Sequence, residues 1–220
     1  GIGHLGVSDR AAAAQGSSQP GPLPLIADNT VIFNEIFNQG LTVSGGGIYV
    51  GGAAPLTPGA LTAGAGNVRI VGNLIQGNSA GAGDGGGLRL AGVNGRDVAA
   101  NPSNTPPNNN NAPKQWYAVD VFDNMIVDNV AGLAGGGISL QDTVAARIVH
   151  NTIANNDSLA VAGEAFPPGS PNQSQPQPGA GLVSRAHSSQ LAAASAAIGT
   201  FSDPSAFADN IIWQNRQFYF

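Results

Sequence analysis

Residues 123–157, DNMIVDNVAGLAGGGISLQDTVAARIVHNTIANND, contain one short pattern twice. The pattern is N-x-I-x-x-N; it begins at Asn124 and begins again at Asn151, 27 residues later. A run of three glycines followed by Ile138 separates the two copies. Restatement of a pattern within one chain indicates a repeat architecture, in which each copy builds one structural unit.

With Asn or Gln at its last position, the pattern occurs five times. Its leading asparagines are Asn34, Asn73, Asn124, Asn151 and Asn210, and its central isoleucines are Ile36, Ile75, Ile126, Ile153 and Ile212. The leading asparagines are 39, 51, 27 and 59 residues apart. Stacked β-coils tolerate such variation because insertions become loops between short strands, whereas an insertion in a helical repeat would rotate its apolar face.

Each coil is expected to contribute short strands to parallel sheets whose neighbouring strands lie about 4.8 Å apart. The strands predicted for one sheet are 31–33, 69–71, 119–122 and 147–149. Those predicted for another, each beginning directly after the glycines or their late counterpart at 179–181, are 48–50, 88–90, 138–140 and 182–184.

The residue types suit corners between such strands. Asparagine tolerates the left-handed backbone of a sharp corner, and its amide can bond to the equivalent amide of the next coil, forming a ladder. The isoleucine two residues later is expected to point inward and to stack on its equivalents. The glycine run is expected to let the chain turn where a Cβ would clash.

This combination of N-x-I-x-x-N and G-G-G-[I/L] resembles the right-handed parallel β-helix of the pectate-lyase-like superfamily. It is most similar to bacterial cell-surface β-helix repeat proteins, and chlamydial polymorphic membrane proteins carry a related glycine-rich version. The resemblance covers residues 29–215, loops excepted. It implies an all-β, single-stranded right-handed parallel β-helix of about five coils, but it implies no single function, because the architecture hosts lyases, hydrolases, epimerases and adhesins.

We expect one β-helix domain over residues 1–220, forming a segment of a longer solenoid. The inserted loops are predicted at about 8–28, 51–66, 91–116, 157–178 and 185–206. Loops along one edge of a solenoid often form a binding surface, although surface loops also accumulate insertions at little cost. Neither end shows a capping helix, so we expect the ends to meet another chain or the remainder of the β-helix, burying Phe218, Tyr219 and Phe220.

The composition narrows the choice of partners. The net charge of −5 offers no basic surface for a phosphate backbone, so nucleic-acid binding is not expected. No apolar run approaches the length of about 20 residues that spans a bilayer. The chain has no cysteine, which removes disulfides and thiolate metal sites and fits an exported bacterial protein at the cell surface or outside the cell.

One charged column is the candidate for chemistry. Arg69, Asp120 and Arg147 occupy the same outward position of successive repeats, four residues before the leading asparagine. As a catalytic or binding site, the column could hold a uronate carboxylate through arginine. The simpler interpretation is a surface salt ladder, in which each exposed pair contributes about 0–1 kcal/mol.

Other constellations carry little signal. Only two glutamates occur, which disfavours a pair of glutamates for glycoside hydrolysis. The acidic residues do not gather as metal ligands, so no cofactor is expected, with calcium kept as the alternative. His150 is expected to be a solvated corner residue, and a Ser-His-Asp arrangement has no spacing signal. Trp116 and Tyr117 could offer a sugar a stacking face or anchor a loop.

The first expectation for function is an exported, non-enzymatic structural or adhesive module that assembles with another chain or with the rest of a longer surface protein. Two alternatives remain open at this point. One is a lyase or hydrolase acting on acidic polysaccharide through the arginine column. The other is a carbohydrate-binding module without turnover.

Overall fold

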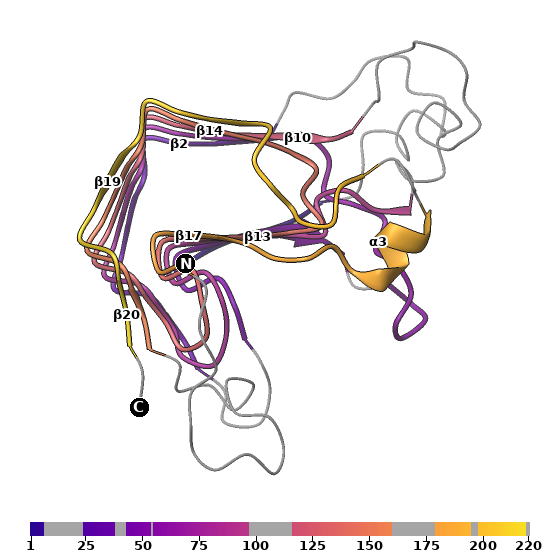
Figure 1. The fold of residues 1–220 in the computed structure, drawn as a ribbon, viewed down its shortest axis with the longest axis horizontal. Helices are drawn as coiled ribbons and strands as arrows, with labels where there is room; N and C mark the ends of the chain where they lie inside the picture. Colours follow the sequence, from indigo (N-terminus) through magenta and orange to yellow (C-terminus); the bar gives the residue numbers. More distant parts are fainter. Residues whose placement is uncertain are drawn as a thin grey trace.

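A computed structural model of the chain describes residues 1–6, 24–37, 43–53, 55–96, 116–159, 179–194 and 198–218. These residues form a parallel β-solenoid in which every coil contributes one strand to each of four five-stranded sheets. Figure 1 looks along the stack, so that strands of successive coils nearly superpose. The all-β fold with five coils is therefore as predicted. Strands were predicted for two sheets, and the structure has four.

The sheets, named A to D in the order in which the chain visits them, have these strands. Sheet A contains β1 (Ile2–Gly6), β5 (Ile48–Gly52), β9 (Leu88–Ala91), β13 (Ile138–Gln141) and β17 (Leu182–Ser184). Sheet B contains β2 (Leu25–Ala27), β6 (Val68–Val71), β10 (Ala118–Phe122), β14 (Ala145–Val149) and β18 (Ala206–Ala208). Sheet C contains β3 (Thr30–Ile32), β7 (Leu74–Gln76), β11 (Met125–Val127), β15 (Thr152–Ala154) and β19 (Ile211–Trp213). Sheet D contains β4 (Glu35–Ile36), β8 (Ser79–Ala80), β12 (Val130–Ala131), β16 (Asp157–Ser158) and β20 (Arg216–Gln217).

The core is built from columns of identical or similar apolar side chains. In sheet C, Ile75, Ile126 and Ile153 pair in register and are fully buried. Side chains alternate between the two faces of a strand, so the residues on either side of each isoleucine point outward. The stacking predicted for these three isoleucines is confirmed, and burial of such columns is the main source of stability in a fold with few charged residues.

Two asparagine ladders run along the corners beside sheet C. In the first ladder, the side-chain amides of Asn73, Asn124, Asn151 and Asn210 are linked, each Nδ2 donating to the Oδ1 of the next at 2.9–3.1 Å. In the second ladder, Asn78, Asn129 and Asn156 are linked in the same way and continue to Asn215. The middle asparagines are buried, so the ladders satisfy polar groups that would otherwise be costly inside the solenoid.

The register predicted for the first repeat is wrong. Asn34 belongs to the second ladder, where its Nδ2 donates to Asn78, while Asn29 occupies the leading position and donates to Asn73. Val31 pairs with Ile75, so valine takes the place that was assigned to Ile36, and Ile36 lies in sheet D beside Ala80. The first copy reads N-x-V-x-x-N, and a search that required isoleucine moved the match five residues along the chain.

The sheet assignment of the first coil changes with this register. Residues 31–33 were predicted to share a sheet with Arg69, but Leu25 is the residue that pairs with Arg69, within a stretch predicted to be loop. The strands 48–50, 88–90, 138–140 and 182–184 do form one sheet, as predicted.

The left-handed corner residue is not the ladder asparagine but the residue before it. Asp123, His150 and Asp209 precede first-ladder asparagines and have φ of 56°, 58° and 54°. Asp128 and Asn155 precede second-ladder asparagines with φ of 57° and 54°. The preceding residue makes the turn and projects outward, which leaves the asparagine amide free to point inward and to bond to its neighbours.

The glycine runs fit backbone-to-backbone contacts between coils. Gly135 has φ of 63°, a left-handed conformation that favours glycine. A Cβ on Gly136 would lie 2.2 Å from the carbonyl oxygen of Asp157, so only glycine fits there without movement of the backbone. The turn predicted for these glycines is thus confirmed, and close approach of the next coil is a second reason for them.

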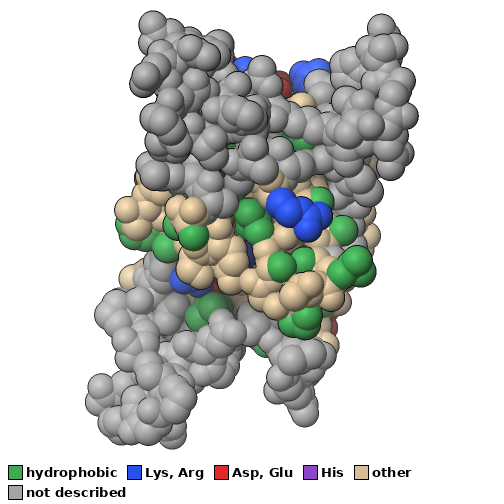
Figure 2. All heavy atoms as spheres, turned by 90° about the vertical axis from the view of Figure 1, so that its right-hand side faces the viewer, with side chains coloured by type: hydrophobic (Ala, Val, Ile, Leu, Met, Phe, Trp, Pro, Cys, Tyr) green, Lys and Arg blue, Asp and Glu red, His purple; other side chains and the backbone are tan. Residues whose placement is uncertain are grey.

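The described parts of the connections from sheet A to sheet B lie along the right-hand edge of Figure 1. Part of one connection is the helix α3 (Ser189–Ala194). Figure 2 faces this edge and shows, in its described band, hydrophobic side chains gathered around a few Lys or Arg side chains. Within the residues that the structure describes, no helix has the length and hydropathy to cross a membrane.

Candidate functional site

The predicted charged column exists on the outer face of sheet B. Asp120 pairs in register with Arg69 on one side and with Arg147 on the other. Arg147 donates from Nε and Nη2 to the two carboxylate oxygens of Asp120, both at 2.7 Å, whereas the Nε of Arg69 lies 3.8 Å from Asp120. The column is therefore one tight bidentate pair with a looser second arginine.

The chemistry open to this column is limited by that pairing. Both oxygens of Asp120 already accept hydrogen bonds from Arg147, and the guanidinium of Arg147 also lies 5.6 Å from the centre of the Phe122 ring. Arg69 and Arg147 are about half exposed while Asp120 is buried, so the loose Arg69 contact adds little to stability. The geometry fits the salt ladder better than an acid–base site, because no free carboxylate faces the arginines within the described column.

A second charged cluster, which the sequence did not reveal, lies at the outer side of sheet A. Asp84 accepts hydrogen bonds from Arg185 at 2.9 and 2.6 Å and from Arg89 at 3.2 Å. Arg89 also donates to Ser139 and Gln141. Asp84 and Arg185 are 101 residues apart, and no spacing signal connects them.

Burial controls the electrostatics of this cluster. Desolvation lowers the pKa of the Arg89 guanidinium from its ordinary value, and the charge of Asp84 works in the opposite direction. The Nε of Arg89 is buried and has no hydrogen-bond partner in the described part of the chain. An arginine held by a carboxylate, a hydroxyl and an amide oxygen is typical of a structural clamp, since its Nη1 and Nη2 are both bonded to groups of this cluster.

A Ser-His-Asp set also forms, between the connection that follows β13 and the one that follows β17. The Nδ1 of His187 lies 3.4 Å from an Asp142 oxygen and 3.2 Å from the Ser202 hydroxyl. A nucleophilic triad needs the serine on one imidazole nitrogen and the carboxylate on the other. Here both contact the same nitrogen, and Ser202 is fully buried, so the set holds the connection in place.

Asp142 is the charged member of that set. Burial alone would raise the pKa of Asp142, but hydrogen bonds from His187 and Ser188 outweigh it and hold the pKa below its ordinary value. The backbone N–H of Ser188 donates to Asp142 at 2.7 Å. The carboxylate is thus ionised and bonded near neutral pH, which suits an anchor better than a proton donor.

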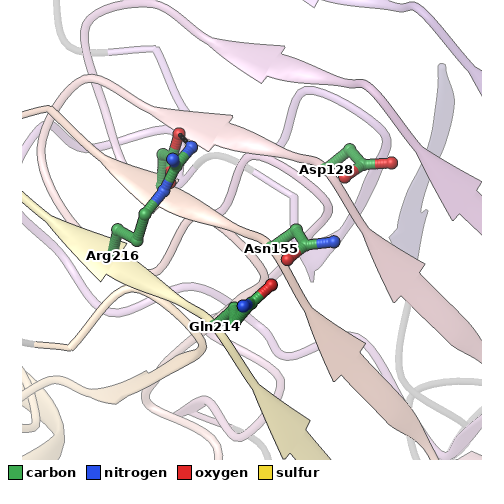
Figure 3. A pocket seen from close by; sticks show the side chains of 5 residues that line it. Asp128, Asn155, Gln214 and Arg216 are labelled. Atoms are coloured by element: carbon green, nitrogen blue, oxygen red, sulfur yellow. Dashed lines mark hydrogen bonds and ion pairs between the residues drawn. The ribbon is translucent and has the colours of Figure 1, made fainter.

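A polar groove of about 500 Å³ lies at the corner between sheets C and D (Figure 3). It is lined by Asp128, Asn155, Asp157, Gln214 and Arg216. Arg216 donates to both oxygens of Asp157, at 2.8 and 2.7 Å, and Gln76 donates to Asp128. The bond to Asp157 raises the pKa of Arg216. Both carboxylates that line the groove, Asp128 and Asp157, are therefore already bonded. The groove is a row of corner residues from successive coils.

The predicted aromatic face for a sugar is not formed. Tyr117 is 4 % exposed and belongs to the apolar core, and Trp116 packs against that core. The backbone N–H of Tyr117 donates to Asn94, which fixes the end of the inserted segment. Tyr117 is buried and Trp116 half-buried because the pair precedes β10 directly and enters the solenoid with that strand. The alternative role, an anchor for the loop, is what the structure shows.

The C-terminal face, defined here as the open edges of β18, β19 and β20, exposes apolar side chains. Phe207 and Ile212 occupy inward positions and are 46 % and 49 % exposed. Their equivalents in the three preceding coils, Ile70, Val121, Ile148, Ile75, Ile126 and Ile153, are fully buried. Phe218 is 37 % exposed, and Tyr219 and Phe220 lie outside the described residues.

His150, predicted to be a solvated corner residue, is a left-handed corner whose Nε2 lies 3.8 Å from Asp209. No group of three or more His, Cys, Asp or Glu side chains that could hold a metal ion occurs within the described ranges. Comparisons with protein-family models, curated proteins and solved structures find no match to this chain.

Proposed function

We propose that this chain is a non-enzymatic structural or adhesive module that assembles through its C-terminal face with a further β-coil. The observation that carries the proposal is the exposure of Phe207 and Ile212. The equivalent side chains in every preceding coil of the described solenoid are buried. Each of β18, β19 and β20 also has a strand neighbour on one side only. Unpaired strand edges flanking exposed core residues invite pairing with another strand.

The asymmetry of the two ends supports this choice of face. In the first coil the inward residues Ile26 and Val31 are 9 % and 5 % exposed. The corresponding residues of the last coil, Phe207 and Ile212, are 46 % and 49 % exposed, so in sheets B and C the apolar surface to be covered lies at the C-terminal face. In a solenoid whose stability comes from contacts between neighbouring coils, covering that face also stabilises the last coil.

The charged groups support a structural role rather than a reaction. Asp84, Asp120 and Asp157 each form bidentate bonds with an arginine, and Asp142 is bonded to His187 and Ser188. Such pairing uses the carboxylates for cohesion between coils. The likeness to bacterial cell-surface β-helix repeat proteins, and a composition without cysteine, favour an exported location at the cell surface or outside the cell.

The test is the solution mass of the chain across a range of concentrations, by sedimentation velocity. We expect concentration-dependent association that Ile212→Asp weakens about tenfold or more, because it places a charge on the apolar face. Ile211→Asp is the matched control, since Ile211 points outward on sheet C and is already 61 % exposed.

Ile212→Ala gives a milder change, so that loss of association can be separated from loss of fold by circular dichroism. A chain that stays monomeric throughout, and whose mass Ile212→Asp leaves unchanged, would overturn the proposal.

A further inference from the structure

We infer that the C-terminal face accepts a β-coil that supplies asparagine side chains at both ladder positions, that is, a partner carrying N-x-[apolar]-x-x-N. This inference rests on the proposed function, because it specifies what occupies the same face. It depends on a different observation, namely the direction of the hydrogen bonds in the two ladders rather than the exposure of apolar side chains.

The ladders have one polarity throughout. At each step, the backbone N–H and the Nδ2 of one asparagine both donate to the Oδ1 of the asparagine in the next coil. Asn124 shows this, with its N–H and Nδ2 lying 3.0 and 2.9 Å from the Oδ1 of Asn151. Asn129 makes the same two bonds to Asn156, both at 3.0 Å. The bonds from each asparagine to the next Oδ1 therefore all run toward the C-terminal face.

At that face the ladder bonds to a following Oδ1 are missing within the described chain. Asn210 and Asn215 accept from Asn151 and Asn156, and each donates once from Nδ2, to the carbonyls of Ile148 and Ile153. Their backbone N–H groups, which the pattern aims at a following Oδ1, have no partner among the described residues. Both asparagines are partly exposed, whereas the asparagines of the three preceding coils are buried.

The partner must also donate. From the second coil on, each ladder asparagine sends its Nδ2 back to a carbonyl of the preceding coil: Asn151 donates to Val121, and Asn210 donates to Ile148. Ile148 pairs with Phe207 and Ile153 with Ile212, so the carbonyl of Phe207 is the next acceptor position of the first ladder and that of Ile212 the next of the second. A carboxylate could accept a hydrogen bond from the N–H of Asn210 but could not donate one to the carbonyl of Phe207. An amide therefore fits the position and an aspartate does not.

The distance between the two positions is fixed as well. Asn210 and Asn215 are five residues apart, with Ile212 between them on the inner face of β19. A partner that meets both asparagines must keep the same spacing, and its middle apolar residue then covers Ile212. These requirements describe a coil of the same kind as those already stacked in this chain, such as the coil that contains Asn151 and Asn156.

The test extends the chain by one coil. A copy of residues 132–158 is joined directly after Gln217, in place of residues 218–220, because Gln217 is equivalent in register to Ser158 and Ala131. In the native chain the same segment follows Ala131. The matched control carries the same copy with both of its ladder asparagines changed, Asn151→Asp and Asn156→Asp within the copy.

The readout is hydrogen exchange at the backbone amides of Asn210 and Asn215 near neutral pH. The asparagine copy should slow their exchange about 100-fold. The aspartate copy should protect them less, by about tenfold or more, because its carboxylates leave buried carbonyls without donors. Equal protection by both copies would overturn the inference while leaving the proposed function intact. No protection by either copy would overturn the inference, and absence of association in the sedimentation experiment would then decide separately against the proposed function.

Discussion

Arg185 and Asp84 are 101 residues apart in the sequence and form a bidentate ion pair, with Nε–Oδ2 and Nη2–Oδ1 distances of 2.9 and 2.6 Å. Asp84 precedes β9 of the third coil, and Arg185 follows β17 of the fifth. The buried Arg89 shares the same carboxylate. One aspartate thus ties together segments of the chain that the strand register alone would leave two coils apart.

Asp84→Asn should be strongly destabilising. The change removes the charge that compensates Arg89, whose surroundings already disfavour its ionised form. Removal of one partner from a buried ion pair costs about 3–5 kcal/mol, and we expect a loss of that order in the free energy of unfolding, measured by urea denaturation. Arg185→Gln is the control: it leaves Asp84 paired with Arg89, and Arg185 is partly exposed, so its cost should be clearly smaller. Equal costs for the two variants would contradict the clamp.

Gly136→Ala tests the close approach of neighbouring coils. Its Cβ would lie 2.2 Å from the carbonyl oxygen of Asp157, a backbone atom that cannot move without disturbing β16. We expect a destabilisation of about 3 kcal/mol or more, at the upper end of overpacking effects. Gly3→Ala is the matched control, since nothing lies within 4 Å of a Cβ built there. Thermal unfolding of both variants followed by circular dichroism gives the comparison, and a Gly136→Ala midpoint equal to that of Gly3→Ala would refute the steric argument.

Asn129→Ala tests the ladder. Asn129 is fully buried and accepts from the N–H and the Nδ2 of Asn78, while its own Nδ2 donates to the carbonyl of Ile75. Alanine leaves these groups unsatisfied, and each buried orphan costs about 1–3 kcal/mol, so the free energy of unfolding should fall by about 3 kcal/mol or more.

The control for the ladder is Asn155→Gly. Asn155 directly precedes the ladder residue Asn156 and is not itself part of the ladder. Asn155 is exposed with φ of 54°, a conformation that glycine adopts freely, so the substitution should change stability little. Urea titration of both variants separates the two roles of asparagine at these corners. A larger loss for Asn155→Gly than for Asn129→Ala would show that the left-handed turn, and not the amide ladder, dominates.

Most of the fold could be predicted from the repeated pattern in the sequence alone. The isoleucines at 75, 126 and 153 and the asparagines two residues before them identify the inner face of sheet C, because period-2 alternation and corner chemistry are local properties. The first coil was misplaced for a local reason too. Val31 packs as well as isoleucine in the same column, and a pattern that demands one residue type cannot see that equivalence.

The charged clusters were visible only in part. The Arg69–Asp120–Arg147 column follows from register, since all three residues occupy one repeat position. Asp84 and Arg185 lie outside the repeat, in connections of different lengths, so their contact depends on the paths of those connections. Tyr117 shows the same limit: whether an aromatic residue at a loop boundary faces water or core depends on how the strand that follows it enters the sheet.

The last prediction concerns Asp142, whose pKa is held below its ordinary value in the folded chain by hydrogen bonds from His187 and Ser188, which outweigh the effect of burial. A lowered folded-state pKa means that the unfolded chain binds the proton more readily, so stability rises with pH across the interval between the two values. The contribution of Asp142 is therefore fully present above about pH 4, the unfolded value, and is lost as the pH falls through the folded value.

Asp142→Asn removes this titration while keeping a residue that tolerates the left-handed backbone at this position, where φ is 50°. The measurement is the free energy of unfolding of both chains from pH 6 to pH 2, by urea denaturation. The native chain should be the more stable above about pH 4, and its advantage should shrink as the pH falls. Titrating groups that do not contact residue 142 are common to both chains, so their contributions cancel in the difference. A difference that stays constant with pH, or grows on acidification, would show that the hydrogen bonds to Asp142 do not stabilise its ionised form.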